Sequence, residues 1–396
     1  MIPTGWQRTK LGAHAVLMGG GTPPRRETQF FEGGDVNWVK TGDLTNGQVS
    51  HTEERITRSA VDACRLLVHE PDTVLIAMYG GFKQIGRTGL LAIPAATNQA
   101  ITAIRCDEAT LVPAFLLSVL NARIGYWRSV AGSSRKDPNI TRADIEFFPL
   151  LLPPVAEQSA IAATAKAWDS AVEKADALIE AKDRYKRGLM RDLLVADRNV
   201  GDPDTTRLSS RQLGELLTES RDRASSGLHA RKLTVKLYGR GVVPKSDRRP
   251  GSPSTQYYRR HAGQLLFSKL DFLNGAFGIV PPELDGYETT LDLPAFDVSD
   301  EIHAPWLLRL FSWPGFYKRH VGLANGGRKA RRVNPSDLLK VNLALPPIDE
   351  QKRIADLFRE LDREIELLQR LRDAYAVQKR TLLDRLLTGE LRLKPA

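Results

Sequence analysis

Apolar residues recur at alternating spacings of four and three along two long stretches of the chain, and this pattern predicts two long helices. The first stretch runs from Ile161 to Leu193 and the second from Ile354 to Leu386. A period near 3.5 residues is typical of a coiled-coil seam. The predicted seam residues are Ile161, Trp168, Val172, Ile179, Leu189 and Leu193 in the first helix, and Ile354, Phe358, Leu361, Ile365, Leu368, Leu382 and Leu386 in the second.

The two stretches are copies of one design. The segment Leu-Pro-Pro-Val-Ala-Glu-Gln at 152–158 returns as Leu-Pro-Pro-Ile-Asp-Glu-Gln at 345–351, an offset of 193 residues. With that offset, residues 152–194 and 345–387 are identical at sixteen positions without a gap. The prolines block a helix from continuing upstream, and Gly389 suits the end of the second helix. Since each helix has an apolar stripe to cover, we expect the two to pair in antiparallel fashion.

A non-repeating block precedes each copy, and each block predicts a mixed fold. The apolar runs 73–78 and 264–267 are typical of buried strands, whereas 114–120 and 306–311 are typical of helices packed on them. The expected fold class is α+β, with two globular domains, two long helices in an antiparallel coiled coil and a pseudo-twofold internal repeat. The expected domains are 1–150, the first helix region 151–197, 198–343 and the second helix region 344–396.

Composition favours an anionic partner. The chain has 396 residues, a formal net charge of +10 and a pI near 9.6, as expected of a protein that binds nucleic acid. We expect no membrane association, since the first residues show no signal-peptide pattern and no apolar run approaches a membrane span. The two cysteines, Cys64 and Cys106, lack metal-ligand spacing and favour a reducing, cytoplasmic setting.

The positive charge is concentrated. Residues 231–260 hold nine Lys and Arg against one acid, and 318–332 hold six against none. A small-residue turn with an Arg-Lys pair closes both blocks, at 135–136 and 328–329. Because Arg and Lys contact phosphates and base edges, we predict these DNA-contacting residues: Arg25, Arg26, Lys40, Lys83, Arg87, Arg135, Lys136, Arg240, Lys245, Tyr257, Tyr258, Arg259, Arg260, Lys269, Arg328, Lys329, Arg331 and Arg332.

A catalytic site cannot be assembled from the sequence. None of the four Pro-Pro pairs has the flanking residues of an amino-methyltransferase motif. The run Gly81-Phe82-Lys83-Gln84-Ile85-Gly86-Arg87-Thr88 has phosphate-loop spacing but carries Arg where Lys is required. We therefore expect no catalytic, cofactor-binding or metal-binding residue on this chain.

Along nearly its whole length, the chain resembles the specificity (S) subunit of type I restriction–modification systems. The resemblance rests on the duplicated Leu-Pro-Pro-x-x-Glu-Gln motif with its long helix, and on the ending 379–391. Gly20-Gly21-Thr22-Pro23 and Trp38-Val39-Lys40-Thr41-Gly42-Asp43-Leu44 look like parts of that family's target-recognition domain. The second block lacks the Gly-Gly-Thr-Pro opening, which fits a domain that reads a different sequence.

The resemblance implies a DNA-binding subunit without catalytic activity of its own. Each block would read one half of a bipartite site on double-stranded DNA, and the helices would act as a spacer. Two methylase (M) subunits would dock on the chain and restriction (R) subunits would join them. S-adenosylmethionine, ATP and magnesium would belong to those partners. The alternatives are a coiled-coil scaffold with incidental basic loops, and a methyltransferase or nuclease with an unrecognised site. The target sequence, the spacer length, the methylated base and the presence of a restriction subunit stay open.

Overall fold

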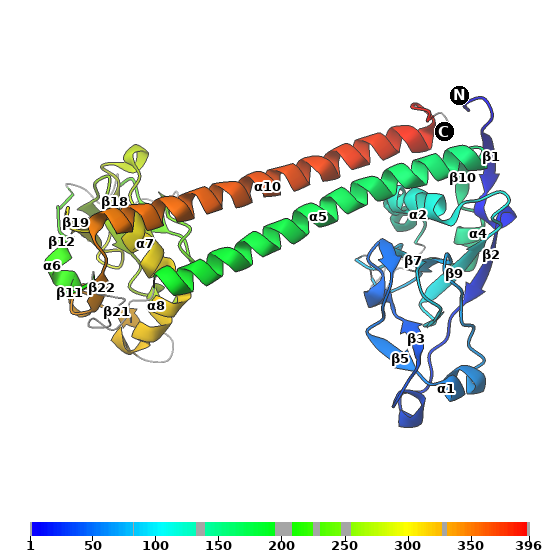
Figure 1. Ribbon diagram of the computed structural model, residues 1–396, viewed down its shortest axis with the longest axis horizontal. Coiled ribbons are helices and arrows are strands. Elements are labelled where there is room, and N and C mark those ends of the chain that lie inside the picture. The colour runs from blue at the N-terminus through cyan, green and yellow to red at the C-terminus, as the bar shows by residue number, and fades with distance from the viewer. Residues whose placement is uncertain are drawn as a thin grey trace. The chain divides into compact units, whose positions relative to one another are not determined.

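The computed structural model describes residues 2–81, 83–131, 139–194, 208–224, 230–246, 255–326 and 331–393. Internal contacts divide the chain into two compact units, the first made of Met1–Asp176 with Arg370–Ala396 and the second of Ala177–Gln369. The long helices α5 (Val155–Leu193) and α10 (Ile348–Thr388) each contribute one half to each unit (Figure 1). Both helices fall within the expected helix regions 151–197 and 344–396 and contain the periodic stretches that predicted them.

Unit 1 is a mixed sheet structure with short helices. A five-stranded sheet has the order β2-β9-β6-β7-β4, and a three-stranded sheet has the order β5-β3-β8. These strands are β2 (Ala15–Gly19), β3 (Val36–Val39), β4 (Gly47–Val49), β5 (Glu54–Ile56), β6 (Val74–Ala77), β7 (Thr88–Leu91), β8 (Ala95–Thr97) and β9 (Ile101–Cys106). The helices are α1 (Arg58–Ala63), α2 (Pro113–Ala122), α3 (Ile124–Val130) and α4 (Arg142–Glu146). The predicted strand at 73–78 and helix at 114–120 are confirmed.

Unit 2 has a four-stranded antiparallel sheet in the order β12-β19-β16-β17 and several two-stranded pairs. The sheet strands are β12 (Leu217–Ser220), β16 (Leu265–Phe267), β17 (Phe277–Ile279) and β19 (Ala295–Val298). The pairs are β13 (Leu233–Val235) with β14 (Val242–Pro244), β15 (Tyr258–Arg259) with β18 (Glu288–Thr289), and β20 (Ala324–Asn325) with β21 (Arg332–Val333). The helices are α6 (Leu213–Leu216), α7 (Ala304–Ser312), α8 (Pro314–Arg319) and α9 (Pro335–Leu338).

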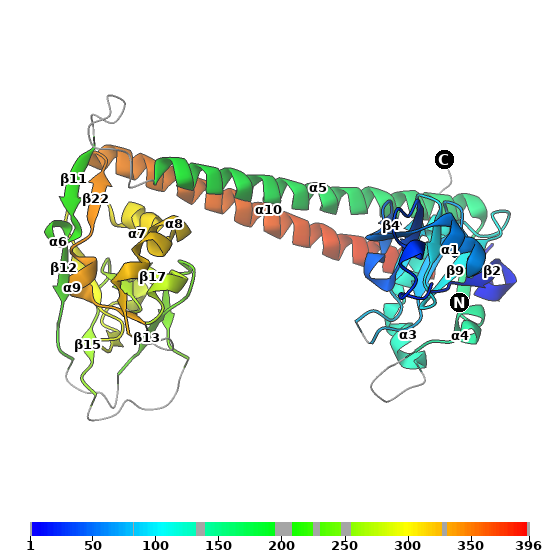
Figure 2. The same cartoon turned by 90° about the horizontal axis from the view of Figure 1, so that it is seen from below.

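Both units begin and end in the same way. In unit 1, β1 (Gln7–Lys10) pairs antiparallel with β10 (Pro149–Leu152), the strand that leads into α5. In unit 2, β11 (Ser209–Gln212) pairs antiparallel with β22 (Asn342–Leu345), the strand that leads into α10 (Figure 2). The prolines that follow β10 and β22 stop the ladder because they lack an amide donor. The repeat therefore includes the closing strand of each unit as well as the helix.

The glutamine of the repeated motif explains why that motif recurs. Gln158 is fully buried; its Oε1 accepts from the backbone amide of Val112 at 2.9 Å and its Nε2 donates to the carbonyl of Pro153 at 2.9 Å. Gln351 is equally buried and does the same with His303 and Pro346, both at 2.8 Å. Val112 and His303 are the N-cap residues of α2 and α7. Each glutamine therefore satisfies a helix-start amide that would otherwise be unpaired.

The apolar stripe of each helix divides between the partner helix and a globular core. In unit 1, Ile161 and Ala165 of α5 and Leu386 of α10 belong to the core that includes Phe115. In unit 2, Phe358 is fully buried with the aromatic core, and Leu189 and Leu193 of α5 pack against it. Burial of one such side chain contributes roughly 1.5–3 kcal/mol. All thirteen residues assigned to the seam are buried or half-buried.

Basic residues interrupt the seam, and acids on the opposite helix pair with them. In unit 2, Lys186 pairs with Asp362 and Lys182 lies 2.8 Å from Glu364. In unit 1, Lys379 pairs with Asp169, and Arg372 lies 3.5 Å from Asp176. The Lys–Asp pairs are reciprocal, because Lys379 and Asp362 are the repeat counterparts of Lys186 and Asp169. Such half-exposed pairs add little stability, but they favour the antiparallel register in both units.

Unit 1 also joins the two ends of the chain. Glu157 is buried, and its carboxylate accepts from Trp6 Nε1 at 3.0 Å and from Arg392 at 2.6 and 2.8 Å. The Arg392 hydrogen bond is the largest effect that lowers the pKa of Glu157. Gly389 ends α10 with a φ of 74°, a conformation that glycine adopts without strain. The turn at this glycine brings Arg392 back to the N-terminal segment.

We expect Gln158→Leu and Gln351→Leu each to lower the free energy of unfolding by about 1–3 kcal/mol, since each leaves a buried amide without an acceptor. The amides of Val112 and His303 should then exchange hydrogen faster in the respective variants. Gln378→Leu, at an exposed position of α10, is the control and should change stability by less than about 0.5 kcal/mol. Unchanged protection of both amides would contradict the anchoring role.

Candidate nucleic-acid interface

Four segments of unit 1 that are far apart in sequence meet at one place. They are residues 20–26, 40–43, 79–87 and 97–100, and they include three of the motifs that the sequence analysis selected. The contacts that join them are Gly21 N to Thr97 O (2.9 Å), Asn98 N to Val39 O (2.9 Å), Thr41 Oγ1 to Gln84 Oε1 (3.0 Å) and Tyr79 OH to Gln99 O (2.7 Å). We call these four segments the unit 1 loop cluster.

Glycine is required where the loop cluster is tightest. A Cβ at Gly20 would lie 2.2 Å from the Asn98 carbonyl oxygen, and one at Gly80, which has φ of +121°, would lie 2.1 Å from the Gln84 side chain. Gly20 can therefore not be replaced without moving the 97–98 backbone. Gln84 fills the space that Gly80 leaves and binds Thr41, so it holds the 79–87 loop against the 40–43 turn.

Two of the predicted DNA-contacting residues in the loop cluster already have acidic partners. Lys40 Nζ lies 2.8 Å from Glu53 and 2.6 Å from Glu54, and Arg25 lies 2.7 Å from Glu54. The hydrogen bonds to Glu53 and Glu54 raise the pKa of Lys40, and those from Arg25 and Lys40 lower the pKa of Glu54. Arg25 also lies over the rings of Phe31 and Trp38. Both cations are thus partly neutralised within unit 1.

Other cations of the loop cluster are more exposed to solvent. The Arg26 side chain is 86% exposed, with only a 3.6 Å approach to Glu27. Lys83 is exposed, and its carbonyl accepts from Arg87 Nε at 3.0 Å. Arg26 and Lys83 are therefore more exposed to solvent than Lys40 and lack the close acidic partners of Arg25 and Lys40.

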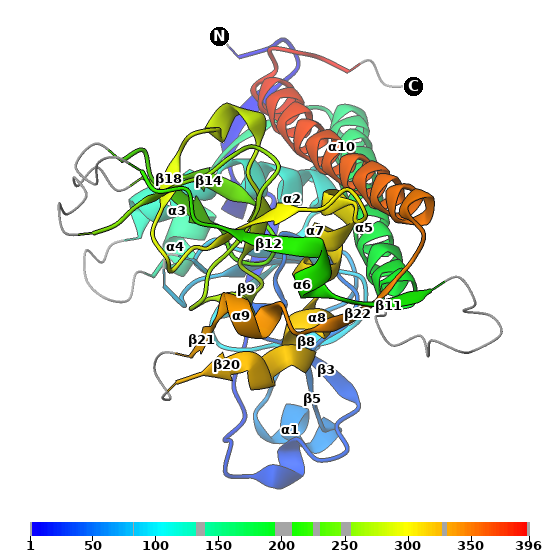
Figure 3. The same ribbon diagram turned by 90° about the vertical axis from the view of Figure 1, so that its left-hand side faces the viewer.

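In both units, the segment that follows the repeated basic loop binds the backbone just after a central strand of the sheet. The amide of Ile140 donates to the carbonyl of Met78, just after β6, at 3.0 Å. The amide of Val333 donates to the carbonyl of Lys269, just after β16, also at 3.0 Å. Arg135, Lys136, Arg328 and Lys329 lie outside the described residues. Figure 3 shows β20 and β21, which flank the second of these loops.

Most of the predicted cations of unit 2 lie at the surface. Arg240, Lys245, Arg259, Arg331 and Arg332 are exposed, whereas Lys269 is half-buried. Arg332 lies 3.7 Å from Asp292, whose carbonyl accepts from the amide of Lys269 at 3.0 Å. Lys269 and Arg332 are therefore neighbours although 63 residues separate them in sequence.

The structure contradicts the expectation that Arg260 is presented to DNA. It is fully buried and donates to Thr289 Oγ1 at 2.7 Å, the Ser220 carbonyl at 3.0 Å and the Leu293 carbonyl at 3.3 Å. Burial lowers its pKa to about 10, so it stays charged at neutral pH. Tyr257 and Tyr258 are also buried, at 8% and 7% exposure. The sequence analysis missed the structural role of Arg260, because charge density along a sequence does not indicate which side chain points inward.

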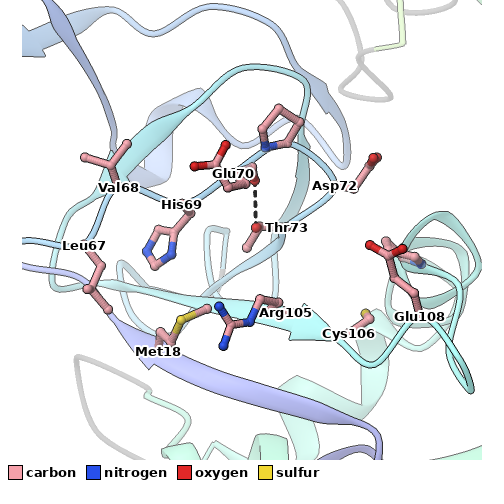
Figure 4. A pocket seen from close by; sticks show the side chains of 12 residues that line it. Met18, Leu67, Val68, His69, Glu70, Asp72, Thr73, Arg105, Cys106 and Glu108 are labelled. Carbon is pink, nitrogen blue, oxygen red and sulfur yellow. Dashed lines mark hydrogen bonds between the residues drawn. The ribbon is translucent and has the colours of Figure 1, made fainter.

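A small cavity of about 220 Å³ in unit 1 contains reactive residue types but no catalytic arrangement. His69 is buried with Nε2 unpaired, and desolvation is the main cause that lowers its pKa. Burial raises the pKa of Cys106 to about 12, so its thiol is a poor nucleophile. In Figure 4 the dashed bond joins Thr73 to the Glu70 carbonyl, and none joins His69 to Cys106. Among the described residues, no group of three or more His, Cys, Asp or Glu could hold a metal ion.

Within the described part of the chain, none of the helices is both long and apolar enough to cross a membrane.

A family model of the type I restriction modification DNA specificity domain matches residues 3–181. A putative type I restriction enzyme specificity subunit of Methanocaldococcus jannaschii is 21% identical over 325 residues, which is 74% of this chain and 71% of that protein.

Solved structures share the fold at low sequence identity. A chain from a structure on complex assembly and conformational transition of the type I R-M system has a TM-score of 0.62 and 17% identity, covering 99% of this chain and 100% of that one. The type I restriction-modification S subunit of M. genitalium has a TM-score of 0.57 and 14% identity, covering 96% of each chain. The expected α+β fold with two paired long helices is confirmed.

Arg260→Met should lower the free energy of unfolding by about 1–3 kcal/mol, because Thr289 Oγ1 and the Ser220 carbonyl lose the Arg260 donor and the Leu293 carbonyl keeps only that of Thr289. The neighbouring Arg259→Met, at an exposed position, is the matched control and should leave stability within about 0.5 kcal/mol. Urea unfolding measures both. Wild-type stability of the Arg260 variant would show that its buried hydrogen bonds are not required.

Proposed function

We propose that this chain, which is a member of the specificity-subunit family of type I restriction–modification systems, reads a bipartite site on double-stranded DNA with one half-site per unit. The family recognises DNA, and we infer that this chain itself catalyses no reaction. The observation that carries the proposal is that both units have the same buried glutamine anchor but different surface cations. Gln158 and Gln351 make equivalent bonds in the two units, whereas the cations of the two units differ in number and position.

Charge supports DNA as the ligand. Positive charge is concentrated in the runs 231–260 and 318–332, and Arg332 of the second run lies beside Lys269. Lys and Arg at such places displace counterions from DNA, so binding should weaken as salt increases. Base identity would be read in the major groove, where each base pair has a distinct pattern of donors and acceptors. Arg, Lys and Gln side chains such as Arg331, Lys83 and Gln84 suit that pattern.

The chemistry would belong to partner subunits. Two methylase subunits would dock on the chain and would flip out and methylate the target base. Restriction subunits would add cleavage. S-adenosylmethionine, ATP and magnesium would be bound by these partners.

Replacing Lys269, Arg331 and Arg332 together by alanine should relax recognition of one half-site and leave the other unchanged, because these residues lie in unit 2. The measurement is methylome sequencing of DNA modified by the complex of this chain with its methylase subunits. Arg142→Ala, an exposed residue of α4 paired with Glu146, is the control and should preserve the full site. Equal relaxation of both half-sites would contradict the assignment of one half-site to each unit.

Inserting one heptad into both α5 and α10 should widen the gap between the half-sites without changing their sequences. Seven residues add about 10.5 Å of helix, which corresponds to about three base pairs of B-DNA, and a heptad keeps the seam in register. Methylation mapping measures the preferred gap. The same insertion in α5 alone is the control and should abolish selective methylation, since the register of the pair is lost. An unchanged gap in the double insertion would refute a spacer role for the helices.

A further inference from the structure

The internal repeat allows each repeated residue to be checked for a role within the fold. Residues 152–194 and 345–387 share sixteen identities out of 43 aligned positions. Many of these side chains make contacts inside their own unit: Gln158 and Gln351 bind helix starts, Asp169 and Asp362 pair with Lys379 and Lys186, and Ile161 and Ile354 lie in the cores. Folding accounts for the recurrence of these residues.

Arg187 and Arg380 are different. They are repeat counterparts, and each directly follows the lysine of a Lys–Asp pair between the helices. Both side chains are exposed, and neither has an ion pair or hydrogen bond with any described residue. Other exposed arginines of these helices are not repeated: Arg191 faces Asp192 and its counterpart is Asp384, while Arg385 faces Glu390. An arginine that recurs in both copies of the repeat without an internal contact indicates that an external ligand binds at both positions.

In unit 2 the surroundings of Arg187 form a cleft of about 940 Å³ between α5, α10, α7, α8 and the β13–β14 turn. Five cationic side chains line it against two acidic ones, and both Lys186 and Arg309 already pair with Asp362. Arg240 has no acidic partner among the described residues. The cleft therefore has unpaired positive charge, chiefly at Arg187 and Arg240.

The rest of the lining favours a protein over a nucleic acid. Met190, Leu308 and the 63% exposed Tyr238 give the cleft apolar surface. Arg, Met and aromatic side chains are enriched at protein–protein interfaces. Asp183 adds a negative charge with no ion pair in the described structure. Planar guanidinium groups beside apolar surface suit a carboxylate next to a hydrophobic side chain.

The two units differ in charged residues that affect binding strength. Arg309 lies six residues after His303, the residue that donates to Gln351, and the equivalent position after Val112 is Ser118. Ser118 bonds the Ala114 carbonyl of its own helix. Unit 2 thus has a cation beside its Lys–Asp pair where unit 1 has a neutral residue. Arg309 offsets Asp183, whose repeat counterpart in unit 1 is the neutral Ala376, and Arg240 adds further positive charge to the cleft. A carboxylate ligand should therefore bind more tightly to unit 2.

We propose that Arg187 and Arg380 are equivalent anchors for a carboxylate-bearing segment of a protein partner that binds once to each unit, and that the unit 2 site binds first. This inference rests on the proposed function only in its choice of probe, the methylase subunit of the same system. The ligand chemistry is a carboxylate flanked by an apolar side chain.

The test titrates purified methylase subunit into the full-length chain and counts bound copies by mass photometry, with dissociation constants from calorimetry. We expect Arg187→Glu to weaken the tighter binding step about tenfold or more, Arg380→Glu to weaken only the second step, and the double variant to bind neither copy at concentrations that saturate the wild type. Arg191→Glu and Arg385→Glu are matched controls on the same helices and should bind as the wild type does. Thermal unfolding checks that all variants are folded.

Wild-type binding by the Arg187 and Arg380 variants would overturn the inference. So would a loss of DNA affinity and of its salt dependence with methylase binding unchanged, because the arginines would then be phosphate contacts. A wild-type complex that assembles but methylates without sequence preference would overturn the proposed function and leave this inference standing. Selective methylation together with unaffected variants would overturn the inference alone.

Discussion

The structure depends on two buried glutamines that tie the start of each long helix to a globular unit. An amide side chain with no solvent access must satisfy its own donor and acceptor, and Gln158 and Gln351 do so with backbone groups of the preceding proline and of a helix start. A buried polar bond of this kind has a strict geometry. It fixes the direction in which the long helix leaves the unit, which apolar packing alone would not do.

With the helix start fixed, the remaining surface of each unit can vary. The strand pairs β1–β10 and β11–β22 close the two units in the same way, but the loops beside β6 and β16 share almost no residues. The ion pairs Lys186–Asp362 and Lys379–Asp169 help to fix the register in which α5 and α10 pair. Recognition can therefore diverge between the units while the frame stays the same. That combination suits a protein that reads two different sequences with one scaffold.

The sequence predicted the parts of the structure that periodicity controls. The seam pattern indicated α5 and α10, and alternation of apolar runs with turns indicated β6 and β16. It could not indicate which charged residues are buried, because Arg260 and Arg259 are adjacent in one basic run and only one of them is enclosed. It also missed Glu54 as the partner of both Arg25 and Lys40. Such contacts join residues far apart in sequence and leave no local pattern.

The order of the two units along the chain determines when each can be completed during synthesis. Unit 1 needs Leu383, Leu386 and Arg392 to fill its core and to pair with Glu157, yet these residues leave the ribosome after all of unit 2. All of unit 2 is encoded between the two parts of unit 1. The nascent chain must therefore hold the first 176 residues with part of their apolar surface uncovered until residues 370–396 emerge. Although domains usually fold in the order in which they emerge, here the inner unit can finish first.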